Sequence, residues 1–186
     1  MALSDLIRWG GLVAMIAAAL FVIADLGVLV LAFGQEPAQG LLVRGAVSGS
    51  AGLVLALGLV GLYAHQAEAA GYLGLIGFLA AFIALWLGQE NVGWAALLAN
   101  VGWVLFGVGS LGAQTYPRIG IILLIAGAVL AGVVNLLLLA IDFGGTVPAA
   151  VVGLGALVDI VFYAGVAWLG ISLFTGRAEE SWHPRS

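Results

Sequence analysis

The sequence predicts an all-α transmembrane bundle of six helices with both termini in the cytoplasm. Of its 186 residues, 64% are hydrophobic and only 8% are charged, and the mean hydropathy is +1.24. A soluble domain is roughly one quarter charged, so the composition is that of a membrane protein. The apolar residues fall into runs of about 20, the length that crosses the hydrocarbon core of a bilayer as a helix.

Charge and cysteine content exclude several classes of protein. The net charge is −4, lysine is absent and no basic run exists, so nothing would neutralise a row of phosphates and nucleic acid is not expected as a partner. The chain has no cysteine, which excludes disulfides and thiolate-bound metals. The expected partner is the lipid bilayer. We expect one membrane domain over residues 1–176 and a short polar tail over residues 177–186.

Six spans can be delimited by polar and turn-forming residues between the apolar runs. The first span is too long for a signal peptide and is expected to be retained. The break at Gln89-Glu90-Asn91 is weak, and a kinked or re-entrant arrangement around Gly88–Gly93 is the alternative there. The predicted spans are Trp9–Phe33, Gly45–Ala64, Gly71–Leu87, Gly93–Ala113, Ile119–Ile141 and Ala149–Thr175.

The arginines predict the orientation. With six spans, Arg8, Arg118, Arg177 and Arg185 share the side of the two termini, and only Arg44 lies on the other side. Cytoplasmic loops carry the excess of basic residues in membrane proteins, so the termini are placed in the cytoplasm.

Four polar side chains interrupt the apolar runs at a similar depth. Asp25 and Asn135 lie eight and six residues from the outer ends of their spans, and Asn100 and Asp159 lie seven and ten residues into theirs. At about 1.5 Å per residue, all four fall roughly 9–15 Å below the outer boundary. They form the candidate ligand-binding site.

The two aspartates dominate this candidate site. The sequence places no Arg, Lys or His at their depth, because Arg44 is expected in a solvated outer loop. A buried carboxylate without a cationic partner either keeps its proton or binds a cation. We therefore expect a site for a proton, a cation or a small amine-bearing solute. The alternative is that the polar side chains only hold helices together, at about 0.6 kcal/mol each.

Other chemistry has little support in the sequence. His65 could ligate a haem- or chlorophyll-type metal, but a solvated helix end is the simpler interpretation, and no second metal ligand is in sight. A bound pigment or quinone is a weaker alternative, and no cofactor is assigned. Ser110 and Ser172 lack a histidine at their depth, and Asp25 and Asp159 lack the local motifs of an intramembrane aspartyl protease. The expectation leans away from an enzyme.

Glycines are expected at helix contacts, because they let backbones approach closely in lipid. The candidate packing faces are Gly45-x-x-x-Gly49, Gly71-x-x-Gly74-x-x-Gly77 and Gly107-x-Gly109.

The segment Gly61–Phe78, which reads GLYAHQAEAAGYLGLIGF, resembles a segment of small uncharacterised bacterial multi-pass membrane proteins. Those proteins commonly carry a basic residue where this chain has His65, which implies a charged position rather than a ligand. The resemblance implies a six-helix topology and a prokaryotic inner (plasma) membrane, and it implies no activity.

The sequence thus leads to two hypotheses. The first is a small binding or transport protein with an outward-facing polar site for a proton, cation or small solute. The alternative is a non-catalytic accessory subunit that packs in a larger membrane complex, or a homo-oligomer, through its glycine-rich faces.

Overall fold

The fold is an all-helical bundle, as predicted. The computed structural model describes residues 3–34, 37–87, 93–140 and 147–176, and within these ranges there are six helices and no strands. Residues 177–186, expected as a polar tail, and the weak break at residues 88–92 lie outside the described residues. The helices are α1 (Leu3–Phe33), α2 (Pro37–Gln66), α3 (Gly71–Leu87), α4 (Gly93–Ala113), α5 (Arg118–Ala140) and α6 (Ala149–Thr175).

Three helices begin earlier than the sequence analysis predicted. Helices α3, α4 and α6 have the predicted bounds, but α1 begins at Leu3, α2 at Pro37 rather than at Gly45, and α5 one residue early at Arg118. Proline is well suited to the first position of a helix, since the N–H it lacks would have no partner there. Pro37, which the sequence analysis took as part of a break, is therefore the first residue of α2.

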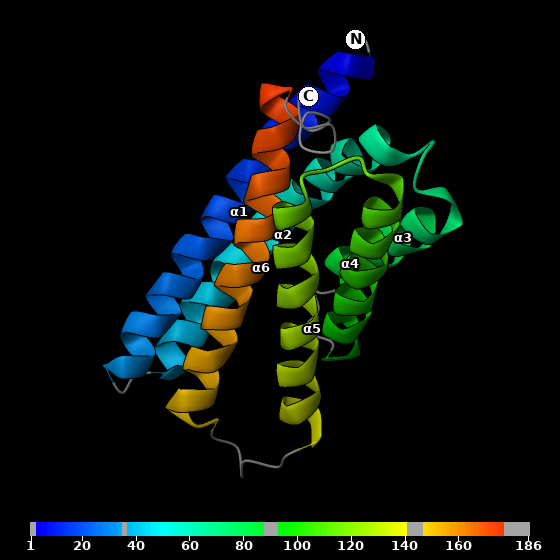
Figure 1. The fold of residues 1–186 in the computed structure, drawn as a ribbon. Coiled ribbons are helices and arrows are strands. Elements are labelled where there is room, and N and C mark those ends of the chain that lie inside the picture. Colours follow the sequence, from blue (N-terminus) through cyan, green and yellow to red (C-terminus); the bar gives the residue numbers. More distant parts are fainter. Residues whose placement is uncertain (1–2, 35–36, 88–92, 141–146, 177–186) are drawn as a thin grey trace.

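The helices lie side by side with both described ends of the chain at one end of the bundle (Figure 1). Helix α1 packs between α2 and α6, α5 packs between α4 and α6, and α3 packs on α4. We call the end that holds Leu3 and Thr175 the terminal end. The opposite end, where α1 ends and α2 begins, is the distal end.

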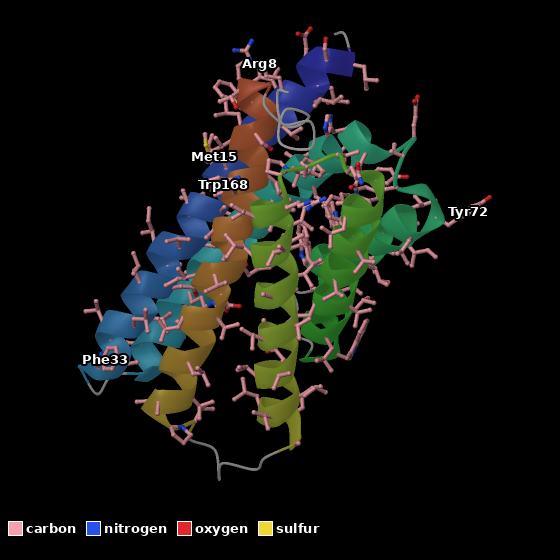
Figure 2. All side chains as sticks on the ribbon, viewed as in Figure 1. Arg8, Met15, Phe33, Tyr72 and Trp168 are labelled. Atoms are coloured by element: carbon pink, nitrogen blue, oxygen red, sulfur yellow. The ribbon has the colours of Figure 1, made fainter. Side chains whose placement is uncertain are left out.

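The outer surface of the bundle is apolar. Five of the described helices are long and apolar enough to cross a membrane, and α3 is a shorter apolar helix of 17 residues. Figure 2 shows Phe33 and Tyr72 directed away from the bundle, and these side chains are 82% and 85% exposed. Large exposed apolar side chains occur on all six helices. This surface suits a lipid environment, and the chain is a multi-pass membrane protein.

Glycines bring the helix backbones into direct contact. A Cβ added to Gly61 of α2 would lie 2.4 Å from the Cα of Gly10 on α1, and a Cβ added to Gly165 of α6 would lie 2.5 Å from the backbone nitrogen of Leu124 on α5. Gly77 and Gly109 also lie against the backbone of a neighbouring helix, whereas a Cβ added to Gly107 would meet the side chain of Ile125. The prediction was wrong for Gly45 and Gly71, each of which has no atom within 4 Å of its added Cβ and faces open space.

These contacts predict a position-dependent cost of adding one methyl group to α2. Gly61→Ala is expected to lower the free energy of unfolding by about 1–3 kcal/mol, because the new Cβ meets backbone that cannot move independently. The matched variant Gly45→Ala on the same helix should stay within about 0.5 kcal/mol of the wild type. Equilibrium unfolding in detergent micelles measures both. Equal stabilities of the two variants would contradict the packing described.

Candidate functional site

Asp25 lies on the buried side of α1. It is eight residues from the distal end of the helix, about 12 Å along the axis. Its exposed fraction is 0%, and the neighbouring Ala24 and Val28 are also buried. Asp25 is therefore an acidic side chain within an otherwise apolar helix interface.

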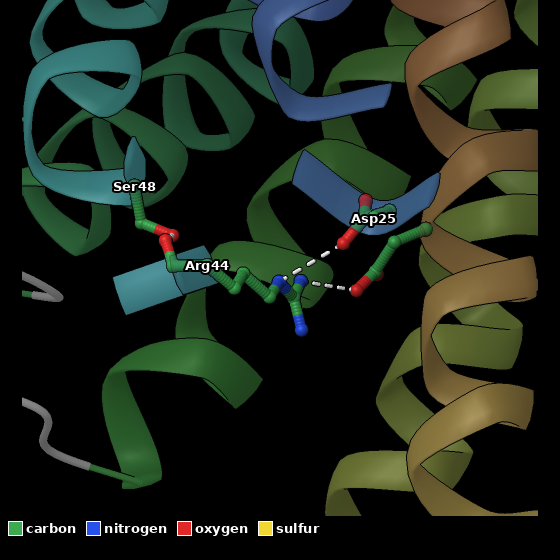
Figure 3. A network of polar contacts seen from close by, with 4 residues as sticks. Asp25, Arg44 and Ser48 are labelled. Atoms are coloured by element: carbon green, nitrogen blue, oxygen red, sulfur yellow. Dashed lines mark hydrogen bonds and ion pairs between the residues drawn. The ribbon is translucent and has the colours of Figure 1, made fainter. Parts of the chain in front are cut away.

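Asp159 faces Asp25 from α6, and Arg44 reaches both from α2. The Nε atom of Arg44 lies 3.1 Å from Oδ1 of Asp25, and its Nη2 atom donates a hydrogen bond to Oδ2 of Asp159. Figure 3 shows the guanidinium between the carboxylate of Asp25 and that of the α6 aspartate. We call Asp25, Arg44 and Asp159 the charged triad.

The expectation that no cation lies at the depth of the aspartates was wrong. Because α2 begins at Pro37, Arg44 is not in a loop but in the third turn of the helix, about 10 Å from its start. That places it at the depth of Asp25 and Asp159. The sequence analysis correctly predicted that the two aspartates share one layer, and it missed the arginine that joins them.

The two aspartates are held unequally. Asp159 accepts a hydrogen bond from Arg44, and its side chain is 18% exposed. Asp25 is within ion-pair distance of Arg44, but neither of its oxygens accepts a hydrogen bond from any described residue. Ser48, one turn from Arg44, does not help, because its hydroxyl donates to the Arg44 carbonyl oxygen at 2.6 Å.

The charges of the triad do not balance. Two ionised carboxylates against one guanidinium leave a formal charge of −1. A net charge inside a bilayer is costly, at least about 2.5–3.5 kcal/mol for a side chain at the helix centre. The triad is therefore an arrangement that favours the arrival of one positive charge.

An aromatic layer covers the terminal side of the triad. One turn from Asp25 and Asp159, the rings of Phe21 and Tyr163 stack with centroids 4.3 Å apart and planes within 3°. Tyr163 is close enough to the three charged groups to interact with them electrostatically. The layer continues through Phe162 to Trp103 of α4, with centroids 5.0 and 5.2 Å apart. Packed rings of this kind separate the charged triad from the terminal end.

The two asparagines of the predicted site lie apart from the triad. Asn100 of α4 lies against Gly132 of α5, where an added Cβ would be 3.6 Å from the Asn100 Cβ, and its Nδ2 atom is buried without a hydrogen-bond partner among the described residues. Asn135 is half-buried on α5. Within the described part of the chain, neither forms a hydrogen bond with Asp25, Arg44 or Asp159. The structure thus brings together the two aspartates of the predicted set of four.

A second polar cluster, which the sequence analysis did not predict as a unit, lies at the terminal end. Gln66 and Ser110 are fully buried and hydrogen-bond each other between α2 and α4. Tyr116, also fully buried, donates its hydroxyl to the Leu62 carbonyl oxygen. Burial raises the pKa of this hydroxyl, so it stays neutral and remains a donor. His65 is half-buried, and its Nε2 hydrogen-bonds the Thr115 carbonyl oxygen at 3.1 Å.

This second cluster has a structural explanation. Its hydrogen bonds link the end of α4 and the connection between α4 and α5 to the last turns of α2. His65 is thus more than a solvated helix end. The sequence signal for the cluster as a whole was weak, since Gln, Ser and Tyr are common at helix ends. The cluster lies on the other side of the aromatic layer from the charged triad.

Known proteins offer no guide to this site: no family model, curated protein or solved structure matches the chain.

The bridging role of Arg44 predicts the effect of its removal. Arg44→Gln leaves the carboxylates of Asp25 and Asp159 facing each other without a cation, and loss of one partner from a buried ion pair typically costs about 3–5 kcal/mol. Unfolding in detergent at neutral pH is expected to show a loss of this size. The loss should shrink as the pH falls, because the folded variant then takes up protons that neutralise the carboxylates.

A triple variant provides the control. In Arg44→Gln combined with Asp25→Asn and Asp159→Asn, no charge remains buried, so most of the lost stability should return. If Arg44→Gln alone is as stable as the wild type, the guanidinium does not bridge the carboxylates.

Proposed function

We propose that the protein is a membrane binding or transport protein whose charged triad binds one positively charged species, a proton or a cation, from the distal side. The observation that carries the proposal is the second carboxylate. One Arg–Asp pair would join α2 to α6 without net charge, but a further aspartate, Asp25, is buried against the same guanidinium.

Asp25 is difficult to explain as packing alone. Interhelical hydrogen bonds in membranes contribute only about 0.6 kcal/mol on average, and Asp25 accepts none from the described residues. An ionised carboxylate costs several times that amount in the same place. A serine or asparagine would hold the helices at lower cost, so a role in binding explains the aspartate better.

The asymmetry of the surroundings supports access from the distal end. Arg44 and Asp159 are partly exposed, at 30% and 18% of their side-chain surface. On the other side of the triad, Phe21 and Tyr163 are buried at 5% and 9% exposure. A species approaching from the distal end meets the triad before it meets the aromatic layer. Asn100 and Asn135, predicted as part of the site, would contribute only after a rearrangement of α4 and α5.

The arginines give the proposed orientation in the cell. Arg8 and Arg118 lie at the terminal end and Arg44 lies toward the distal end, so the terminal end is proposed to face the cytoplasm. The distal end, and with it the charged triad, then opens to the outside. The resemblance of the Gly61–Phe78 segment to bacterial membrane proteins supports an inner (plasma) membrane location.

Reporter fusions test this orientation. A fluorescent protein fused to the C-terminus should fluoresce in a bacterial host, and alkaline phosphatase at the same position should be inactive. Phosphatase inserted between α1 and α2 should be active, because that connection is proposed to be outside. The opposite pattern would place the triad on the cytoplasmic side and overturn the proposed direction of access.

Single substitutions test the binding role. Trp103 is in the aromatic layer that contacts the triad through Phe162 and Tyr163, so its fluorescence is expected to report occupancy of the site. In purified protein in which the other five tryptophans are replaced by phenylalanine, titration with protons or with Na⁺ or K⁺ at fixed pH should change this fluorescence. Asp25→Asn and Asp159→Asn should each abolish the change while the helical circular dichroism stays that of the wild type.

The matched control is Glu68→Gln, which removes an exposed carboxylate between α2 and α3 at the terminal end. This variant should titrate like the wild type. If both aspartate variants also titrate like the wild type, the triad is structural and the accessory-subunit hypothesis becomes the better account.

A further inference from the structure

We infer that the species bound at the charged triad is a single proton, that Asp25 takes it, and that Arg44 remains paired with Asp159 in both states. This inference rests on the proposed function and specifies its ligand.

The charge count gives the stoichiometry. With both carboxylates ionised the triad carries −1, and one added positive charge makes it neutral. A second proton would leave the guanidinium with no negative partner, which restores the cost of a net charge in the bilayer. The triad is therefore built for one charge, not two.

Hydrogen bonding decides which carboxylate takes the proton. Arg44 donates to Asp159, and this charge-assisted bond favours the ionised form of Asp159. Neither oxygen of Asp25 accepts a hydrogen bond from the described residues, and the side chain has no exposed surface. A buried carboxylate in that position gains most from an added proton. The proton arrives from water at the distal side and forms an O–H bond on the Asp25 carboxyl group.

Among the residues that the structure describes, the charged and titratable groups around Asp25 lie on the two helices that pack against α1. Helix α2 contributes Arg44 and helix α6 contributes Asp159 and, one turn away, the Tyr163 hydroxyl. Within the described ranges no other ionisable side chain is paired with Asp25. The charge state of Asp25 is thus governed by these three groups.

Size argues for a proton over a metal ion. Asp25 is 0% exposed, so a hydrated cation has no direct contact with its oxygens. Among the described residues, no three or more His, Cys, Asp or Glu side chains are grouped so that they could hold a metal ion. A proton needs neither an open cavity nor further ligands.

Infrared spectroscopy of the purified protein in lipid tests the inference. The C=O band of protonated aspartic acid, identified by ¹³C-aspartate labelling, is followed in difference spectra between high and low pH. The signal of the other two aspartates is measured in the Asp25→Asn/Asp159→Asn double variant and subtracted. For the triad alone, the charge count then predicts one protonated carboxyl in the wild type and none in Asp25→Asn or Asp159→Asn, because either variant leaves a neutral Arg–Asp pair. It predicts two in Arg44→Gln. If that variant fails to fold, Arg44→Gln/Asp25→Asn, which keeps one carboxyl, should show one.

Conservative variants locate the proton. Glutamate and aspartate carboxyls absorb at different frequencies, and ¹³C-aspartate labelling does not mark a glutamate. Asp25→Glu should therefore remove the labelled band and produce a shifted one, whereas Asp159→Glu should leave the labelled band in place. Disappearance of the labelled band in Asp159→Glu and its persistence in Asp25→Glu would overturn the assignment to Asp25.

The outcomes separate this inference from the proposed function. If Na⁺ or K⁺ at fixed pH changes the Trp103 fluorescence and no carboxyl band titrates, the triad binds a cation: the proposed function stands and the proton inference fails. If neither protons nor these cations produce any change that depends on Asp25, both fail. A band equivalent to two protonated carboxyls in the wild-type triad would overturn the inference of a single proton and leave the proposed function standing.

Discussion

The guanidinium of Arg44 ties three helices together within an otherwise apolar bundle, and the arrangement of α1, α2 and α6 depends on that contact. Charges inside a bilayer must be paired or neutralised, so Asp25 and Asp159 can both be ionised at this depth only where a cation reaches both. This requirement fixes the rotation and the relative height of the three helices. The close approach of Gly61 to Gly10 fixes the distance between α1 and α2 at the other end of the same interface.

The sequence was sufficient for the helices and for the shared depth of the aspartates, because apolar run length and rise per residue determine both. It was not sufficient for Arg44. Treating Gln35, Glu36 and Pro37 together as a break placed the arginine in a loop, whereas Pro37 is the first residue of α2. A helical stripe offered the missing signal: Ser48, Ala51, Leu55, Leu59 and Leu62 recur every three to four residues, and Arg44 continues that stripe. In this stripe, the side chains from Ala51 to Leu62 are buried.

The asparagines show the opposite limit. Asn100 and Asn135 were predicted at the depth of the aspartates, yet depth does not specify the face of a helix, and Asn100 lies against Gly132 between α4 and α5. Contacts such as that of Ser110 with Gln66 depend on how α2 and α4 approach each other, which no local pattern encodes. The bundle thus has three layers along its axis: a charged layer near the distal end, an aromatic layer beside it, and a hydrogen-bonded cluster at the terminal end.

The central claim is that one arginine bridges the buried Asp25 and the partly exposed Asp159 in the membrane. Solid-state NMR of the protein in lipid bilayers, with ¹⁵N-arginine and ¹³C-aspartate labels, measures it directly through dipolar couplings between guanidinium nitrogens and carboxyl carbons. The account predicts couplings from Arg44 to both Asp25 and Asp159, each lost in the corresponding asparagine variant. Coupling of Arg44 to neither carboxyl, or to Asp159 alone at every pH, would contradict it.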